Sequence, residues 1–111
     1  VWDRILDLGL WPQEVRDREM GSYLSRQKPF GLPLDSRHAY SKNDWIFWTA
    51  CLTGERAHLE ALSAPLVKWL RETPDRVPLS DWFDTETGKH YHFRARSVVG
   101  GFFFPLFAQN R

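Results

Sequence analysis

The feature that most constrains this chain is a pattern that occurs twice, with an offset of about 45 residues. Each copy has an apolar stretch, a glycine, a more polar stretch and a long loop that contains a Pro-Leu pair. Gly9 aligns with Gly54, and Pro33 aligns with Pro78. Because the offset lies in the range of paired-helix repeats, each copy predicts one helical hairpin. A third apolar helix is expected to begin after Ser97, which gives an all-α chain of two and a half hairpins.

The two stretches of the second copy differ in how much of their surface is apolar. Residues 43–53 are apolar on almost every side, which predicts a helix that is buried all round. Ser41 and Asp44 resemble a capping box at the start of this helix. Residues 55–73 combine an apolar stripe with charged positions, which is typical of a helix with one wet face. Pro65 is expected to break or restart that second helix, with Ser63 or Ala64 as the new cap.

Buried helices that alternate with wet ones predict two layers, one inner and one outer. In that arrangement the short glycine turns lie at one end, and the long loops 28–41 and 74–97 lie together at the other. The second loop contains a Thr-Gly pair between two short runs. These runs predict a small β-hairpin that pairs residues 82–84 with 91–94.

Size, charge and cysteine content exclude several classes of protein. The chain has 111 residues, enough for one domain at most. Its formal net charge is +1 and it has no long basic run, so we expect neither nucleic acid nor a membrane as a partner. The single cysteine, Cys51, excludes an internal disulfide bond and lies in an apolar stretch that predicts a buried thiol. His90 and His92 have no third ligand at a telling spacing, so we expect no metal and no cofactor.

Ionisable residues that suit catalysis gather in the two long loops. Asp35 and Asp81 each follow a Pro-Leu pair, which places two carboxylates at one end of the scaffold. Such a pair suits acid and base, or acid and nucleophile, roles in hydrolysis. Arg37, Arg94 and Arg96 suit the binding of a substrate carboxylate through two hydrogen bonds each, and Arg96 is favoured among them. The alternative is structural, with each Asp capping a turn or pairing with a neighbouring Arg.

Four stretches that cover nearly the whole chain carry a resemblance to a known family. They are "VWDRILDLGLWP", "YLSRQKPFGLPLDSRHAYSKNDWIFWTACL", "ETPDRVPLSDWFDTETGK" and "FRARSVVGGFF", and they closely resemble the C-terminal part of the glutaminase A family. The resemblance implies a six-helical-hairpin domain, an (α/α)6 toroid, of which residues 1–111 would form a single arc. It also implies hydrolysis of L-glutamine to L-glutamate and ammonia by a secreted or periplasmic parent protein. Within these stretches the candidate functional residues are Asp35, Arg37, Asp44, Trp45, Asp81, Trp82, Asp84, Arg96 and Ser97.

Three functions fit these observations. The first is a fragment of a glutaminase-like amidohydrolase, which is not catalytic without the remainder of its domain. The second is a segment of a six-hairpin carbohydrate-active enzyme, in which Tyr40, Trp45 and Trp82 bind substrate by stacking on sugar rings. The third is a structural segment whose open inner-helix faces bind the remainder of the domain or a second copy of the chain. The expected ligand is a small molecule, either an amino-acid amide or a sugar.

Overall fold

The computed structural model describes residues 1–110. About half of the chain is helical, and the remaining regular structure is a small antiparallel sheet of two strands. In chain order the elements are α1 (Trp2–Ile5), α2 (Gln13–Ser25), β1 (Tyr40–Lys42), α3 (Asn43–Ala50), α4 (Arg56–Glu72), β2 (Trp82–Asp84), the 3-10 helix η1 (Ser97–Phe103) and α5 (Phe104–Gln109).

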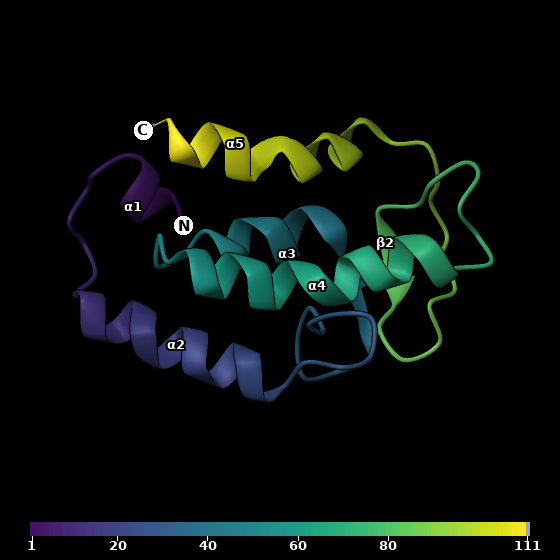
Figure 1. Cartoon of the computed structure of the whole chain (residues 1–111), viewed down its shortest axis with the longest axis horizontal. Coiled ribbons are helices and arrows are strands. Elements are labelled where there is room, and N and C mark those ends of the chain that lie inside the picture. The colour runs from purple at the N-terminus through teal and green to yellow at the C-terminus, as the bar shows by residue number, and fades with distance from the viewer. Residues whose placement is uncertain (111) are drawn as a thin grey trace.

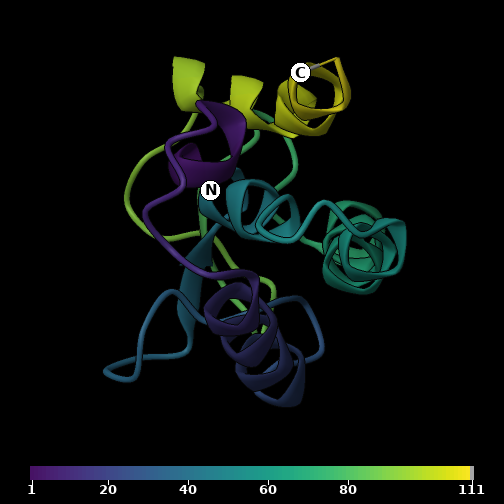
Figure 2. The same cartoon turned by 90° about the vertical axis from the view of Figure 1, so that its left-hand side faces the viewer.

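The longer helices lie side by side along the longest dimension of the molecule, which measures 40 Å (Figure 1). α3 lies in the middle and packs against α4, η1 and α5, while α4 also contacts α2 (Figure 2). The connections from α1 to α2 and from α3 to α4 lie at the left of Figure 1. The two long loops lie toward the other end, so the helices form a scaffold with its loops grouped on one side.

The two long loops are joined by the small sheet. β1 belongs to the first loop and β2 to the second, and they pair antiparallel from Tyr40 opposite Asp84 to Lys42 opposite Trp82. Three ladder positions therefore connect segments that lie some forty positions apart in the sequence. This pairing confirms that the loops lie at one end of the scaffold.

The predicted β-hairpin within the second loop has the wrong pairing for residues 82–84. Residues 82–84 form β2, but residues 91–94 form no strand, and the return segment contributes only an isolated bridge between Phe83 and His90. A positive φ of 39° at His92 interrupts the extended run that a second strand would need. β1 instead supplies the ladder for β2.

The main hydrophobic core lies where α3, α4 and β2 meet. Ile46 of α3 packs there with Leu62 and Leu66 of α4, and all three side chains are buried. Trp69, also of α4, stacks on Phe83 of β2 with ring centroids 4.2 Å apart. The buried positions of α4 confirm the apolar stripe that the sequence predicts, and they attach the loop end of the molecule to the helices.

The break expected at Pro65 is wrong, because α4 continues through it from Arg56 to Glu72. Proline has no N–H to donate to the carbonyl four residues earlier, which here belongs to Ala61. The side-chain amide of Gln27 donates to that carbonyl at 3.1 Å. A side chain that lies just after α2 thus supplies the hydrogen bond that Pro65 cannot make.

The start of α3 differs from the expected capping box of Ser41 and Asp44. Ser41 lies in β1, and no side chain caps the helix. The backbone N–H of Asn43 donates to the carbonyl of Asp81, and its side-chain amide donates to the carbonyl of Ser80, both at 3.0 Å. The backbone of the second loop therefore satisfies the start of α3.

The prediction that α3 is buried all round is wrong, because the indole of Trp45 is half exposed. The face of α3 that carries Trp45 is turned toward the first long loop, where the open pocket described below lies. The exposed indole of Trp45 can therefore contact a ligand in this pocket.

The expected third apolar helix consists of two shorter helices, η1 and α5. Pro105 lies in the first turn of α5, where a missing N–H costs no intrahelical hydrogen bond. Gly101 of η1 lies directly against α3, since a Cβ placed there would be 2.7 Å from the Cα of Asp44. The glycine allows η1 to approach the N-terminal turn of α3.

Candidate functional site

An ion cluster lies at the junction of the two long loops, and we call it the buried ion cluster after its buried centre, Asp81, although Arg96 and Lys42 are partly exposed. Asp81, which is fully buried, accepts hydrogen bonds from Nε and Nη2 of Arg96, the former at 3.0 Å. Nζ of Lys42 donates to the same carboxylate at 3.2 Å. Burial opposes ionisation, but the hydrogen bonds from Arg96 and Lys42 hold the pKa of Asp81 below its ordinary value. Asp81 is therefore an ionised group whose two oxygens already have cationic partners.

Asp44 lies beside this cluster, and its pKa is displaced in the opposite direction from that of Asp81. Its side chain is buried, and Oδ1 has no hydrogen-bond partner among the described residues. Burial raises the pKa of the Asp44 carboxyl, and the negative charge of Asp81 adds to the increase, while Lys42 opposes it. Neighbouring carboxyls with pKa values displaced in opposite directions are an arrangement found in acid–base sites.

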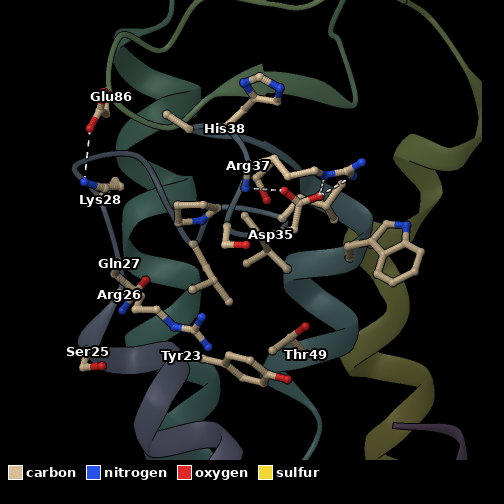
Figure 3. Close-up of a pocket in the computed structure, with 18 residues that line it drawn as sticks. Tyr23, Ser25, Arg26, Gln27, Lys28, Asp35, Arg37, His38, Thr49 and Glu86 are labelled. Atoms are coloured by element: carbon tan, nitrogen blue, oxygen red, sulfur yellow. Dashed lines mark hydrogen bonds and ion pairs between the residues drawn. The ribbon is translucent and has the colours of Figure 1, made fainter.

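An open pocket of about 780 Å³ lies between the end of α2, the first long loop and α3 (Figure 3). We call it the loop pocket. It is lined by Tyr23, residues 25–28 and 32–39, Ser41, Trp45, Ile46, Thr49 and Glu86. Its walls thus combine an aromatic face from α3 with ionisable groups from the loop, which is the composition of many small-molecule sites.

Asp35 and Arg37 form an ion pair on the wall of the loop pocket. The guanidinium of Arg37 donates to Oδ2 of Asp35 through Nη2 at 2.5 Å and Nε at 3.1 Å, and its backbone N–H donates to Oδ1 at 2.8 Å. These hydrogen bonds from Arg37 lower the pKa of Asp35. The side chain of Arg37 is 70% exposed. Figure 3 shows the pair across the pocket from Tyr23 and Thr49.

The predicted site residues therefore fall into separate groups. Asp35, Arg37 and Trp45 line the loop pocket, whereas Asp81 and Arg96 belong to the buried ion cluster. The structure does not bring Asp35 and Asp81 to one cavity among the residues it describes. Each carboxylate has an arginine partner, as the structural alternative proposes, and their catalytic roles stay a prediction.

Tyr40 and Trp82, the other two aromatic residues predicted to bind substrate, contact one another. The ring of Tyr40 lies edge-on to Trp82 at 5.3 Å between centroids and stacks on His38 at 5.1 Å. Trp82 in turn stacks on Tyr91, and Nζ of Lys42 lies 5.8 Å from its ring centroid. These rings are packed by protein groups, and neither residue lines the loop pocket. Their role in substrate binding also stays a prediction.

His90 has polar partners within the protein, and Cys51 is buried. His90 lies 3.1 Å from Asp75 and 2.9 Å from Arg94. Within residues 1–110, no three side chains of His, Cys, Asp or Glu are grouped as metal ligands. Cys51 is buried, as expected, and burial raises the pKa of its thiol. In the same part of the chain, every helix is too short or too polar to cross a bilayer.

Comparison with known proteins places this arrangement in a family. The family model described as "Glutaminase A six helical-hairpin domain" matches residues 1–106. The chain belongs to this family. The glutaminase A match spans almost all of the described chain, including both long loops, the buried ion cluster and the loop pocket.

Two curated relatives of the glutaminase A domain carry glutaminase names. The chain is 38% identical over 107 residues to glutaminase A of Aspergillus oryzae (strain ATCC 42149 / RIB 40), which covers 94% of the chain and 15% of that protein. It is 38% identical over 98 residues to a probable glutaminase of Arthroderma benhamiae (strain ATCC MYA-4681 / CBS 112371), which covers 86% of the chain and 11% of that protein. The chain thus spans a small part of the length of these relatives. No solved structure matches it.

The sequence prediction for this glutaminase A segment did not include several residues of the site. Thr49 lines the loop pocket four positions after Trp45 on α3, so helical spacing alone could have identified it. Tyr23 comes from α2, and its place in the pocket depends on how α2 packs, for which the sequence has no local signal. Lys42 contacts Asp81 because β1 pairs with β2, and this long-range pairing has no local signal in the sequence.

Proposed function

We propose that this chain is a segment of a glutaminase-like amidohydrolase that converts L-glutamine to L-glutamate and ammonia. The observation that carries the proposal is the family match over residues 1–106, together with 38% identity to a protein named glutaminase A. Because the chain covers 15% of that relative, the activity belongs to the larger protein and requires the remainder of its domain.

In this proposal the loop pocket forms part of the substrate-binding wall. Arg37 holds the α-carboxylate of the substrate, and its 70% exposed guanidinium supports this role. Asp35, whose pKa is lowered by Arg37, is ionised at neutral pH and can accept a proton from water or bind the substrate ammonium. Trp45 provides an apolar face for the methylene groups of the substrate.

The second carboxylate of the predicted pair, Asp81, enters the proposal as a group that organises the site. Its hydrogen bonds with Arg96 and Lys42 hold the second long loop against β1. Catalysis by Asp81 itself would require one of these cations to release it. The geometry therefore favours a positioning role for both Asp81 and Arg96.

The same proposal includes the arc of an (α/α)6 toroid and its partner, the remainder of the domain. Support comes from apolar side chains exposed near both ends of the chain, including Leu10 and Trp11 after α1 and Phe103 and Leu106 near α5. Leu10 is 66% exposed and Phe103 is 69% exposed. Surface of this kind favours contact with other apolar surface. In the isolated chain it would favour self-association.

The test is ammonia release from L-glutamine by the complete protein that carries this chain. We expect release well above the background of a preparation that lacks the enzyme, with L-glutamate formed in equal amount. A pure, folded preparation that releases no ammonia from glutamine would contradict the proposed function. Light scattering on the isolated chain tests the partner proposal, which a stable monomer would contradict.

A second candidate function is a carbohydrate-active enzyme built on the same segment. The observation that favours it is Trp45, whose indole is half exposed in the loop pocket. An exposed indole beside an ionised carboxylate such as Asp35 suits a sugar ring and a hydrolytic group. A panel of glycans assayed for reducing ends tests this alternative, and turnover of none of them would remove it.

A further inference from the structure

The loop pocket is larger than free glutamine requires. Its volume of about 780 Å³ lies in the upper part of the range for pockets that take drug-sized ligands, which is about 300–1,000 Å³. Free L-glutamine is a much smaller molecule than such ligands. A ligand that filled the pocket would therefore extend beyond a single amino acid, from the pair of Asp35 and Arg37 toward the end of α2 (Figure 3).

The charges on the walls of the loop pocket do not balance. Among the described lining residues, the Lys, Arg, Asp and Glu side chains are those of Arg26, Lys28, Arg37, Asp35 and Glu86. Both carboxylates have a cationic partner in the wall, since Asp35 binds Arg37 and Glu86 lies 3.2 Å from Nζ of Lys28. Arg26 has no carboxylate partner within residues 1–110. The unpaired positive charge favours an anionic ligand.

Arg26 follows α2 directly, and hydrogen bonds to Ser22 hold its guanidinium in place. Nε donates to the backbone carbonyl of Ser22 at 3.3 Å, and Nη2 donates to its Oγ at 2.8 Å. The guanidinium carbon lies 5.7 Å from the ring centroid of Tyr23. Nη1 donates to no acceptor in the part of the chain that the structure describes, and the residue is exposed, so this nitrogen is free to bind a ligand. Figure 3 shows Arg26 beside Tyr23, across the pocket from Asp35.

We propose that Arg26 is a second anion subsite of the loop pocket, and that the pocket takes a glutamine whose α-amine is joined by an amide bond to an acidic group, as at the C-terminus of an acidic peptide. This inference rests on the proposed function, in which Arg37 holds the α-carboxylate. The acidic group then reaches Arg26, and the segment between the two anions contacts apolar side chains of the wall, such as that of Trp45. Acylation also removes the ammonium of free glutamine, so Asp35 keeps only its proton-accepting role.

The test compares two probes of the same shape that differ in the second anionic group. N-Succinyl-L-norvaline carries a second carboxylate, and N-(4-methylpentanoyl)-L-norvaline has an isopropyl group in its place. Neither has a carboxamide that the protein could hydrolyse. NMR titrations near neutral pH measure their affinities for the complete protein that carries this chain. We expect the succinyl probe to bind at least about fivefold more tightly, and L-norvaline, which has a free ammonium, to bind more weakly than both.

Variants of Arg26 separate the anion subsite from a structural role. Arg26→Gln should bring the two affinities within about twofold of each other, whereas Arg26→Lys, which keeps the charge, should retain part of the preference. Arg18→Gln, an exposed site on α2 outside the pocket lining, is the matched control and should leave the ratio unchanged. If Arg26 serves only to bind the carbonyl of Ser22 at the end of α2, its loss would alter the unfolding temperature and leave the ratio intact.

If Arg26→Gln fails to fold, the salt dependence of wild-type binding decides. Because Arg26 is exposed, added salt screens its charge, and the preference for the succinyl probe should shrink as the ionic strength rises. The affinity of the uncharged isopropyl group for the pocket has no such dependence, which makes the ratio of the two affinities the quantity to follow. An equal ratio at low and high salt would contradict the subsite.

Three results would overturn this assignment. They are equal affinity of the wild type for the two acylated probes, a preference that Arg26→Gln leaves intact, and tighter binding of L-norvaline. Failure of the proposed function is distinct, because it is measured as ammonia release. A protein that prefers the succinyl probe through Arg26 but releases no ammonia from glutamine or N-succinyl-L-glutamine would retain this subsite and lose the glutaminase proposal. Ammonia release from glutamine without a preference that depends on Arg26 would do the reverse.

Discussion

The guanidinium of Arg96 binds both carboxylate oxygens of Asp81, and this pair connects the segment before η1 to the segment before β2. The two residues lie fifteen positions apart, with β2 and the rest of the second loop between them. Lys42 adds a third connection, from β1. Because Asp81 is fully buried, loss of its charge or its partners should loosen the whole loop end of the molecule.

Asp81→Asn tests the contribution of this ion cluster to stability. The change leaves two partly exposed cations without their carboxylate, so we expect the free energy of unfolding to fall by about 1–2 kcal/mol. The measurement is calorimetric unfolding of the complete protein near neutral pH, with Asp17→Asn, an exposed site on α2, as the control. An unfolding temperature within error of wild type would show that the cluster contributes little to stability.

The ion cluster should also make the stability of the folded protein depend on pH. Hydrogen bonds from Arg96 and Lys42 lower the pKa of Asp81 in the folded state. The stabilisation is therefore fully present above the pKa of the unfolded carboxyl, and it is lost as the pH falls through the folded pKa. The wild-type unfolding temperature should fall in acid more steeply than that of Asp81→Asn. Parallel curves for the two proteins would contradict this account.

Gly101→Ala should destabilise the protein, because the new Cβ would lie 2.7 Å from the Cα of Asp44, on a backbone that cannot easily move. We expect a loss of about 1–3 kcal/mol in the free energy of unfolding. Gly100→Ala is a matched control in the same helix, since no heavy atom lies within 4 Å of its added Cβ. Equal unfolding temperatures for the two variants would contradict close packing between η1 and α3.

Local patterns predicted the parts of the fold that local physics decides. The apolar spacing of α4 placed Leu62, Leu66 and Trp69 in the core because a helix repeats its faces regardless of partner. The ion pair of Asp35 with Arg37 was the structural alternative to a role in catalysis or binding, and the sequence could predict it because these residues are two positions apart. In both cases the contact depends on neighbours in the chain.

Contacts across the chain account for the predictions that were wrong. α4 continues through Pro65 because Gln27, which lies thirty-four positions before Ala61, satisfies the carbonyl of Ala61. β2 pairs with β1 and not with the segment that follows it. The partners of Asp81 are likewise distant in sequence, and no local signal distinguishes this carboxylate from Asp35.

A double-mutant cycle tests the role of Gln27 in α4. Gln27→Ala should lower the free energy of unfolding by about 1 kcal/mol, because the carbonyl of Ala61 loses its donor. In a Pro65→Ala background the backbone N–H of residue 65 can donate to that carbonyl, so the same change should cost less. Gln13→Ala, which removes an exposed amide bonded to Asp17, is the control. Equal costs of Gln27→Ala in both backgrounds would contradict the coupling.

Arg37→Ala separates a binding role from a structural one. The pair of Arg37 with Asp35 is exposed, and exposed ion pairs contribute little to stability, so the unfolding temperature should hardly change. If Arg37 holds the α-carboxylate of glutamine, KM for ammonia release should rise at least about tenfold with kcat nearly constant. Arg37→Lys should recover only part of the loss, because an ammonium cannot make the two parallel hydrogen bonds of a guanidinium.

The matched control for Arg37→Ala is Arg18→Ala, an exposed arginine on α2 that does not line the loop pocket. It should leave both KM and the unfolding temperature unchanged. If Arg37→Ala behaves like Arg18→Ala, Arg37 does not contact the substrate. If it lowers the unfolding temperature and kcat together, the arginine acts by holding the first long loop, and Arg37→Lys should then restore both. Only a change in KM at constant stability supports the loop pocket as the place where the substrate carboxylate binds.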